Sequence, residues 1–158
     1  MKQLIPSGYC LSCQGCCRFS SDQGSWVTKL LPSEQSALGL QAQAVPLVEQ
    51  PGQALWYCAY LEPEKNACSL YARRPFECQL YPFVLNRRRD AVLLAYDMNC
   101  RFVQEQCGSS AFAGYARELA AYLCSSPVRG QLEKAGYMLA SYEGAIDCAY
   151  LFRCETGA

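Results

Sequence analysis

A dense run of cysteines near its start constrains this chain more than any other feature. Cys10, Cys13, Cys16 and Cys17 lie within eight residues, in the run CLSCQGCC. Packing alone does not account for that density, so we interpret these cysteines as metal ligands. The chain has no histidine, and a soft-metal site must therefore be built mainly from thiolates. Thiolate ligands suit zinc in an all-sulfur tetrahedron, iron or copper bound by sulfur, or an iron–sulfur cluster.

Later cysteines extend the ligand set to eight with Cys58, Cys68, Cys78 and Cys100. Within the first run, each C-x-x-C step lets a tight turn direct two sulfurs at one metal. In an extended segment, Cys17 would point away from its neighbour Cys16, so the two do not serve one ion in the same way and one of them must reach another site. This leaves two alternatives, namely two adjacent sites or one cluster completed by the later thiols. Two four-coordinate sites would use all eight cysteines.

Size and charge limit the other possibilities. At 158 residues and 17.6 kDa, we expect a single domain spanning residues 1–158. With 14 basic and 14 acidic residues, the net charge is zero, and we expect neither a nucleic-acid partner nor an anionic membrane surface as one. We also expect no membrane span, because no apolar stretch approaches the roughly 20 residues required. The triplet at residues 87–89 is interpreted as a solvated hairpin turn, with a docking patch as the alternative.

Whether the cysteines bind metal or form disulfides depends on how reducing the cellular compartment is. The opening MKQLIPSGYC lacks the apolar region of a signal peptide, so we expect a cytoplasmic protein. A reducing cytoplasm favours metal ligation over disulfides. Adjacent cysteines such as Cys16 and Cys17 do not readily meet disulfide geometry with one another. A disulfide scaffold is the alternative reading.

Local patterns predict an α+β fold in which a small cysteine-rich metal-binding region with short β-hairpins packs on two C-terminal helices. The ligand region spans residues 10–100. It is predicted to contain an irregular loop over 1–18, a strand over 26–31, a helix capped by Ser33, a hairpin carrying Cys58 and Cys68, and a helical turn delivering Cys78.

The remaining elements follow from turn residues and from periodicity. A second hairpin is predicted from residues 83–85 and 91–96, with Cys100 just beyond it. Apolar residues at helical spacing predict two supporting helices within residues 109–144. Residues 40–54 have the least pattern and are predicted to form a surface loop or weak strand.

The cysteine pattern resembles that of the YkgJ-like cysteine-cluster family, a zinc- or iron-chelating domain. The resemblance covers about residues 10–100 and includes the CxxCxxCC run, followed by the pattern C…C-x-x-Y…R-P-x-x-C-x-x-x-P at Cys58, Cys68, Tyr71, Arg74, Pro75, Cys78 and Pro82. It implies metal or iron–sulfur binding and leaves the metal and any reaction unspecified. The C-P pair that follows the first three cysteines of a ferredoxin is absent, which argues against a ferredoxin fold.

Positive side chains near the thiols are candidates for a supporting role. A four-thiolate zinc centre is formally dianionic, and Arg18, Arg73 or Arg74 could offset its charge and donate to sulfur. Arg74, which belongs to the family pattern, is the candidate cofactor-binding residue. The alternative for these residues is a surface pair and a helix start. Tyr71 and Tyr81 are expected to pack.

The last four cysteines fall outside the family pattern: Cys107, Cys124, Cys148 and Cys154. We expect them to be small buried hydrophobic residues. The alternative for Cys148 and Cys154 is an accessory thiol pair.

Three classes of function remain. No nucleophile with its base and no phosphate-binding loop is present, which disfavours hydrolysis and phosphoryl transfer. The leading hypothesis is a metal-binding protein that holds zinc or iron, the iron alone or in an iron–sulfur cluster, through a multi-thiolate site. The alternatives are an iron-dependent redox or peptide-modifying enzyme, and a metal chaperone. Whether the protein is an enzyme, and what protein partner it has, does not follow from the sequence.

Overall fold

The computed structural model describes residues 4–153 and divides the chain into two compact units, residues 1–79 and 80–158. Both units contain helices and small antiparallel sheets, so the predicted α+β class is confirmed. The organisation as one domain stays a prediction.

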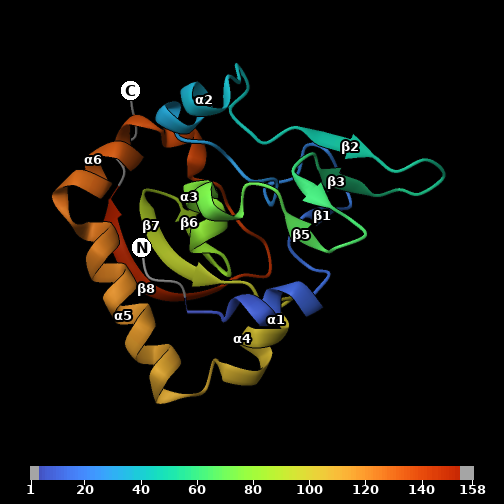
Figure 1. The fold of residues 1–158 in the computed structure, drawn as a ribbon. Coiled ribbons are helices and arrows are strands. Elements are labelled where there is room, and N and C mark those ends of the chain that lie inside the picture. Colours follow the sequence, from blue (N-terminus) through green and yellow to red (C-terminus); the bar gives the residue numbers. More distant parts are fainter. Residues whose placement is uncertain (1–3, 154–158) are drawn as a thin grey trace. The chain divides into compact units, whose positions relative to one another are not determined.

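The first unit is built on a three-stranded sheet in the order β1-β3-β2 (Figure 1). These strands are β1 (Arg18–Phe19), β2 (Leu47–Glu49) and β3 (Trp56–Cys58), all antiparallel to their neighbours. A separate two-stranded sheet joins β4 (Leu61–Glu62) to β5 (Ala67–Cys68). The predicted hairpin carrying both Cys58 and Cys68 is therefore wrong in its pairing, because Cys68 lies opposite Leu61 and Cys58 lies opposite Leu47.

Short helices connect these strands: α1 (Ser7–Ser12), α2 (Pro32–Leu38), the 3-10 turn η1 (Tyr71–Arg73) and α3 (Phe76–Leu80). The helical turn that delivers Cys78 is confirmed as α3. Two predictions are wrong. The first 18 residues include the helix α1, and residues 26–31 form only an isolated bridge, between Lys29 and Ala44.

The cap of α2 also differs from the prediction. Its N-cap is Leu31, with φ −61° and ψ 153°, and Pro32 begins the helix. A residue before proline is driven towards extended conformations, while proline itself suits the first helical position. The pair Leu31-Pro32 therefore starts the helix before Ser33 can cap it.

The first unit has a small hydrophobic core that includes cysteines. Its buried cluster consists of Val27, Leu30, Val45 and Cys58. Partly buried side chains pack against this cluster, among them Cys17. The thiols of Cys17 and Cys58 are thus placed by the same packing that holds the unit together.

The second unit contains a three-stranded antiparallel sheet, β6-β7-β8, formed by β6 (Phe83–Arg88), β7 (Ala91–Tyr96) and β8 (Ile146–Arg153). The predicted β6–β7 hairpin is confirmed, and Arg89 at its turn has a φ of 58°. Arg88 pairs with Asp147 at 3.1 Å, and Arg153 pairs with Asp90 at 2.8 Å. Of the arginine triplet, Arg87 and Arg88 therefore end β6 and Arg89 lies in the hairpin turn, with a carboxylate paired to Arg88.

Helices α4 (Arg101–Gln106), α5 (Ser110–Cys124) and α6 (Ser126–Lys134) and the 3-10 turn η2 (Gly136–Met138) complete this unit. Figure 1 shows α5 running beside β8. Phe112 of α5 stacks on Phe83 of β6, with ring centroids 5.2 Å apart. The two predicted C-terminal helices are present, although the second ends at Lys134, before the end of its apolar pattern.

Candidate metal centre

Four cysteines of the first unit come together from four separate elements. Cys17 directly precedes β1, Cys58 ends β3, Cys68 ends β5, and Cys78 lies in α3. The backbone N–H of Cys58 donates to the carbonyl oxygen of Cys17 at 3.0 Å, which joins two of these segments. We call these residues the four-thiol group.

The thiols of this group influence one another's pKa values. The pKa of Cys17 is raised to about 12, first by burial and then by the charges of three nearby thiols, those of Cys58, Cys78 and Cys68. Arg18 partly opposes this rise. Burial is also the main cause that raises the pKa of Cys78 to about 12, with smaller contributions from Cys58 and Cys68. Cys17 and Cys78 are therefore protonated at neutral pH in the metal-free protein.

Polar contacts hold the Cys78 helix in place. The Cys78 thiol donates to the Thr28 hydroxyl, with Sγ 3.5 Å from Oγ1. The Glu34 carboxylate accepts the backbone N–H of Phe76 at 2.6 Å, at the start of α3. The adjacent Glu77 carboxylate accepts the backbone N–H of Lys29 at 2.5 Å. Cys78 and the start of α3 are therefore anchored to Thr28 and Lys29 and to Glu34 of the helix α2.

A second thiol group lies at α1. Cys10 belongs to this helix and Cys13 is its C-cap, with the N–H of Cys13 donating to the carbonyl of Cys10 at 3.2 Å. Burial raises the pKa of Cys10, the Arg74 guanidinium opposes that rise, and a charged Cys13 adds to it. None of the four-thiol group contributes to this shift. Cys10 therefore interacts electrostatically with Arg74 and Cys13.

Two of the three candidate arginines lie near thiols. Arg18 lies close enough to Cys17 to lower its pKa, and its guanidinium is 5.2 Å from the centre of the Tyr57 ring. Arg74 lies near Cys10, 4.0 Å above the Tyr71 ring, and donates through Nε to the carbonyl of Tyr71 at 3.2 Å. Tyr71 thus supports Arg74. That Arg74 contacts a cofactor stays a prediction.

The donor chemistry of the four-thiol group fits a soft metal, since four thiolates are a complete set for tetrahedral zinc or iron. Within residues 4–153, however, no three or more Cys, Asp or Glu side chains converge closely enough to hold an ion as they stand. Without a shared positive ion, no attraction draws neutral thiols to the short distances at which they would act as ligands of one metal. The four-thiol group supplies the ligand types that the metal requires, and its four sulfur atoms would move towards one another when the metal binds.

The other candidate ligands are placed less decisively. Cys16 is exposed at the end of the first run. Cys100 is buried at the N-cap of α4, in the second unit, and its role as a ligand stays a prediction. No disulfide joins any of the cysteines in the described part of the chain.

The expectation of burial is wrong for two of the cysteines near the end. Cys124 is exposed because it follows Leu123, the last residue of the buried stripe of α5, and its thiol donates to the carbonyl of Leu151 at 3.2 Å. Cys148 on β8 is exposed as a residue, although its thiol is turned inwards and donates to the carbonyl of Leu94 at 3.3 Å. Cys107 is partly buried, and Cys154 lies outside the described residues.

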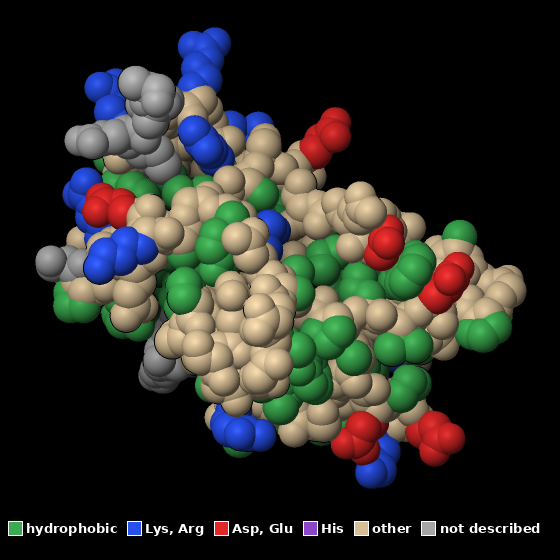
Figure 2. All heavy atoms as spheres, turned by 90° about the horizontal axis from the view of Figure 1, so that it is seen from above, with side chains coloured by type: hydrophobic (Ala, Val, Ile, Leu, Met, Phe, Trp, Pro, Cys, Tyr) green, Lys and Arg blue, Asp and Glu red, His purple; other side chains and the backbone are tan. Residues whose placement is uncertain are grey.

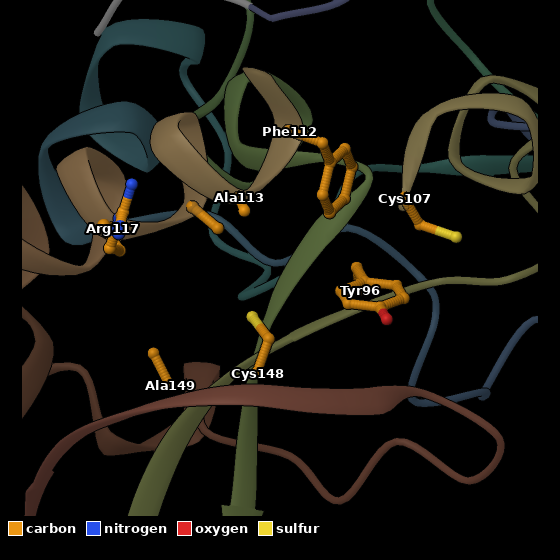
Figure 3. Close-up of a pocket in the computed structure, with 8 residues that line it drawn as sticks. Tyr96, Cys107, Phe112, Ala113, Arg117, Cys148 and Ala149 are labelled. Atoms are coloured by element: carbon orange, nitrogen blue, oxygen red, sulfur yellow. The ribbon is translucent and has the colours of Figure 1, made fainter. Parts of the chain in front are cut away.

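Cys107 and Cys148 border a pocket of about 270 Å³ between α5 and strands β7 and β8 (Figure 3). Tyr96 lines the same pocket, and burial followed by the charges of both thiols raises its pKa. Burial and the charge of Asp147 raise the pKa of Cys148 to about 11. Both effects disfavour a reactive thiolate at Cys148.

The comparison with known families agrees with this site. Residues 9–107 match the model of a family described as "CxxCxxCC: Putative zinc- or iron-chelating domain". The chain belongs to the CxxCxxCC family. The matched region includes the four-thiol group, the Cys10–Cys13 pair and Cys100. No curated protein and no solved structure matches the chain.

Three polar residues around the CxxCxxCC thiols were not anticipated: Thr28, Glu34 as an anchor of α3, and Asn66. Thr28 and Glu34 lie far in sequence from the cysteine that they support. Asn66 carried a local signal, because it ends the turn Glu62-Pro63-Glu64-Lys65-Asn66, where asparagine tolerates a left-handed backbone. Its φ is 48°.

Basic and acidic side chains both occur on the face drawn in Figure 2, with hydrophobic side chains between them. No helix within residues 4–153 has the length and apolar character to cross a bilayer. The absence of a nucleic-acid partner stays a prediction.

Proposed function

We propose that this protein holds zinc or iron through the thiolates of the four-thiol group. The observation that carries this proposal is the shared electrostatic neighbourhood of Cys17, Cys58, Cys68 and Cys78, delivered by four different elements. A bound metal lowers thiol pKa values by coordination and removes the need to bury four protonated sulfurs. Arg18, beside Cys17, would offset part of the negative charge of the thiolate site.

Burial favours stable holding over delivery. A metal chaperone requires accessible thiolates that exchange their ion readily. Cys58 is 8% exposed and belongs to the hydrophobic core of the first unit, against which Cys17 packs. Loss of the metal would therefore disturb the core, which is the behaviour of a structural or redox centre.

An iron–sulfur cluster is a second candidate for the same residues. Four cysteines are also the ligand set of [2Fe–2S] and [4Fe–4S] clusters, which contain inorganic sulfide as well as iron. A four-cysteine set that leaves no open coordination position favours electron transfer or structure over substrate chemistry. An enzyme would instead need a metal with one coordination position left free for substrate. The Cys10–Cys13 pair, with Arg74 nearby, is the candidate for such a site, because two thiols do not fill the coordination of a metal.

Metal analysis of the protein purified without oxygen tests this proposal. We expect about one zinc or one iron per four-thiol group by elemental analysis, or about two to four irons with an equal amount of acid-labile sulfide if a cluster is present. Cys58→Ser and Cys78→Ser should each lose this metal. Cys124→Ser is the matched control, because Cys124 is an exposed thiol of the second unit.

The outcomes separate the candidates. Colourless protein with zinc supports a structural thiolate site, whereas brown protein with iron and sulfide supports a cluster. Metal retained in full by both Cys58→Ser and Cys78→Ser would refute the assignment of the four-thiol group. Absence of any metal would refute the proposed function.

A further inference from the structure

Asn66 connects the hairpin that carries Cys68 to the helix that carries Cys10. Its Nδ2 amino group donates to two backbone carbonyls at short range, Leu11 at 2.7 Å and Cys13 at 2.6 Å. A third carbonyl, that of Cys10, lies 3.5 Å from the same nitrogen. Cys10 and Leu11 lie in the last turn of α1 and Cys13 is its C-cap, and the carbonyls at the end of a helix need hydrogen-bond donors from outside it.

The remaining atoms of the Asn66 amide fix its orientation. Oδ1 accepts a hydrogen bond from the Arg18 guanidinium at 2.9 Å. Because guanidinium groups only donate and carbonyls only accept, the amide must place its oxygen towards Arg18 and its nitrogen towards α1. Arg18 directly follows Cys17, so a single amide contacts segments from both thiol groups.

The backbone of Asn66 fits this role. Its φ of 48° is in the left-handed region, which asparagine adopts more readily than most residues. The turn between β4 and β5 thereby presents the amide to α1. Cys68 follows two residues later, so the position of the amide and that of a four-thiol ligand are set by the same hairpin.

We propose that Asn66 is a positioning residue for metal binding, which holds the segment from Cys10 to Cys13, at the end of α1, in place and sets the accessibility of its two thiols. The metal-binding part rests on the proposed function: the four-thiol group holds the metal, and Asn66 connects the hairpin of Cys68 and the Arg18 beside Cys17 to the Cys10–Cys13 pair. Two thiols separated by two residues can serve one ion only if the intervening backbone stays ordered. The bonds to the carbonyls of Leu11 and Cys13 supply that order from outside the segment.

The test uses two variants that keep a left-handed backbone accessible. Asn66→Gly removes the whole amide without adding strain at this φ. Asn66→Asp keeps an acceptor for Arg18 and replaces the amino group with an oxygen that cannot bond to carbonyls. Arg89→Gly is the matched control, because Arg89 also has a positive φ, of 58°, and lies in the second unit.

The first measurement is the alkylation rate of each cysteine in the metal-free full chain, followed by mass spectrometry. Both Asn66 variants should alkylate about tenfold faster at Cys10 and Cys13, the change expected from losing two hydrogen bonds of ordinary net strength. The rate at Cys124 should stay unchanged, which excludes general unfolding. Unchanged rates at Cys10 and Cys13, or wild-type rates in Asn66→Asp alone, would overturn the proposal.

The second measurement is competition for zinc and for Co²⁺ against a chelator, with the cobalt–thiolate absorption recorded. Metal affinity should fall about 10- to 100-fold in both Asn66 variants, as for other groups that orient ligands. Faster alkylation with unchanged metal affinity would overturn the role in metal binding. A wild-type protein that binds neither metal would refute the proposed function, while the metal-free alkylation rates would still decide whether Asn66 holds the segment.

Discussion

At the scale of single residues, the protonation of the buried thiols determines how metal can bind. Burial is the largest cause of the raised pKa of Cys17, Cys58 and Cys78. The neutral forms stabilise the metal-free fold below the ordinary thiol pKa, and this contribution is lost as the pH rises through the raised values. A metal must displace these protons, because the thiolate is the ligand.

We therefore predict that metal affinity rises steeply with pH between 6 and 8. With about four protons released per ion, the apparent association constant should increase by up to about four orders of magnitude per pH unit. Chelator competition at several pH values measures the slope, and calorimetry in buffers of different ionisation enthalpy counts the protons. A slope near zero would show that the thiols are already ionised and contradict the raised pKa values of Cys17 and Cys78.

Thr28 offers a second prediction at this scale. Its hydroxyl accepts from the Cys78 thiol in the metal-free structure, at 3.5 Å, and can rotate to donate once Cys78 is a thiolate. Thr28→Val, of similar shape, removes this donor and should lower zinc affinity about tenfold. Thr28→Ser retains the hydroxyl and should bind zinc as the wild type does. Equal affinities in all three proteins would assign Thr28 a packing role only.

At the scale of elements, Glu34 links the start of one helix to the start of another. Its carboxylate accepts the N–H of Leu31 at 2.8 Å, at the N-cap of α2, and that of Phe76 at 2.6 Å, at the start of α3. A carboxylate can accept both bonds, whereas a glutamine side chain has one oxygen and turns an amino group towards the other donor.

Glu34→Gln should therefore destabilise the first unit by about 1–3 kcal/mol, the cost of one lost hydrogen bond to a charged acceptor. Both tryptophans, Trp26 and Trp56, lie in this unit, so urea unfolding followed by tryptophan fluorescence measures the change. Glu49→Gln, at an exposed position of β2, is the matched control and should unfold as the wild type does. A Glu34→Gln protein as stable as this control would show that the two bonds do not anchor α3.

The elements also show which structural features the sequence determines locally. The helix α5 was predictable because buried residues recur at helical spacing and Ser109 caps it, accepting the N–H of Phe112 at 3.1 Å. The strand β8 was not, because its consecutive Leu151 and Phe152 are both buried and its register with β7 shifts twice. Its pairing depends on distant residues.

The candidate site likewise combines features that the local sequence indicates with features that depend on distant residues. The spacing of the first cysteines predicts thiolate ligands, which stays a prediction, while the Arg-Arg-Pro run before Phe76 correctly indicated the helical turn α3 that carries Cys78. The grouping of Cys17 with the later thiols, apart from Cys10 and Cys13, is set by strand pairing such as that of Arg18 with Tyr57. Spacing within the run could not reveal a division made by tertiary structure.

At the scale of the whole molecule, the two units differ in how much apolar surface they bury. Of the 28 buried hydrophobic residues among residues 4–153, seven lie in the first unit and 21 in the second. A unit of about 80 residues with few buried side chains has little stability to spare. Metal ligation supplies stability that such a core lacks.

We therefore predict that removal of the metal loosens the first unit and leaves the second folded. Addition of a strong chelator should change the fluorescence of Trp26 and Trp56 and increase hydrogen exchange over residues 4–79, because the thiols that close the core lose their common ligand. Helical circular dichroism should largely persist, since α5 and α6 lie in the second unit. Returning zinc should restore protection. A chelator that raises exchange equally in both units would show that the metal stabilises the chain as one cooperative body, whereas unchanged exchange in the first unit would show that its fold does not depend on metal.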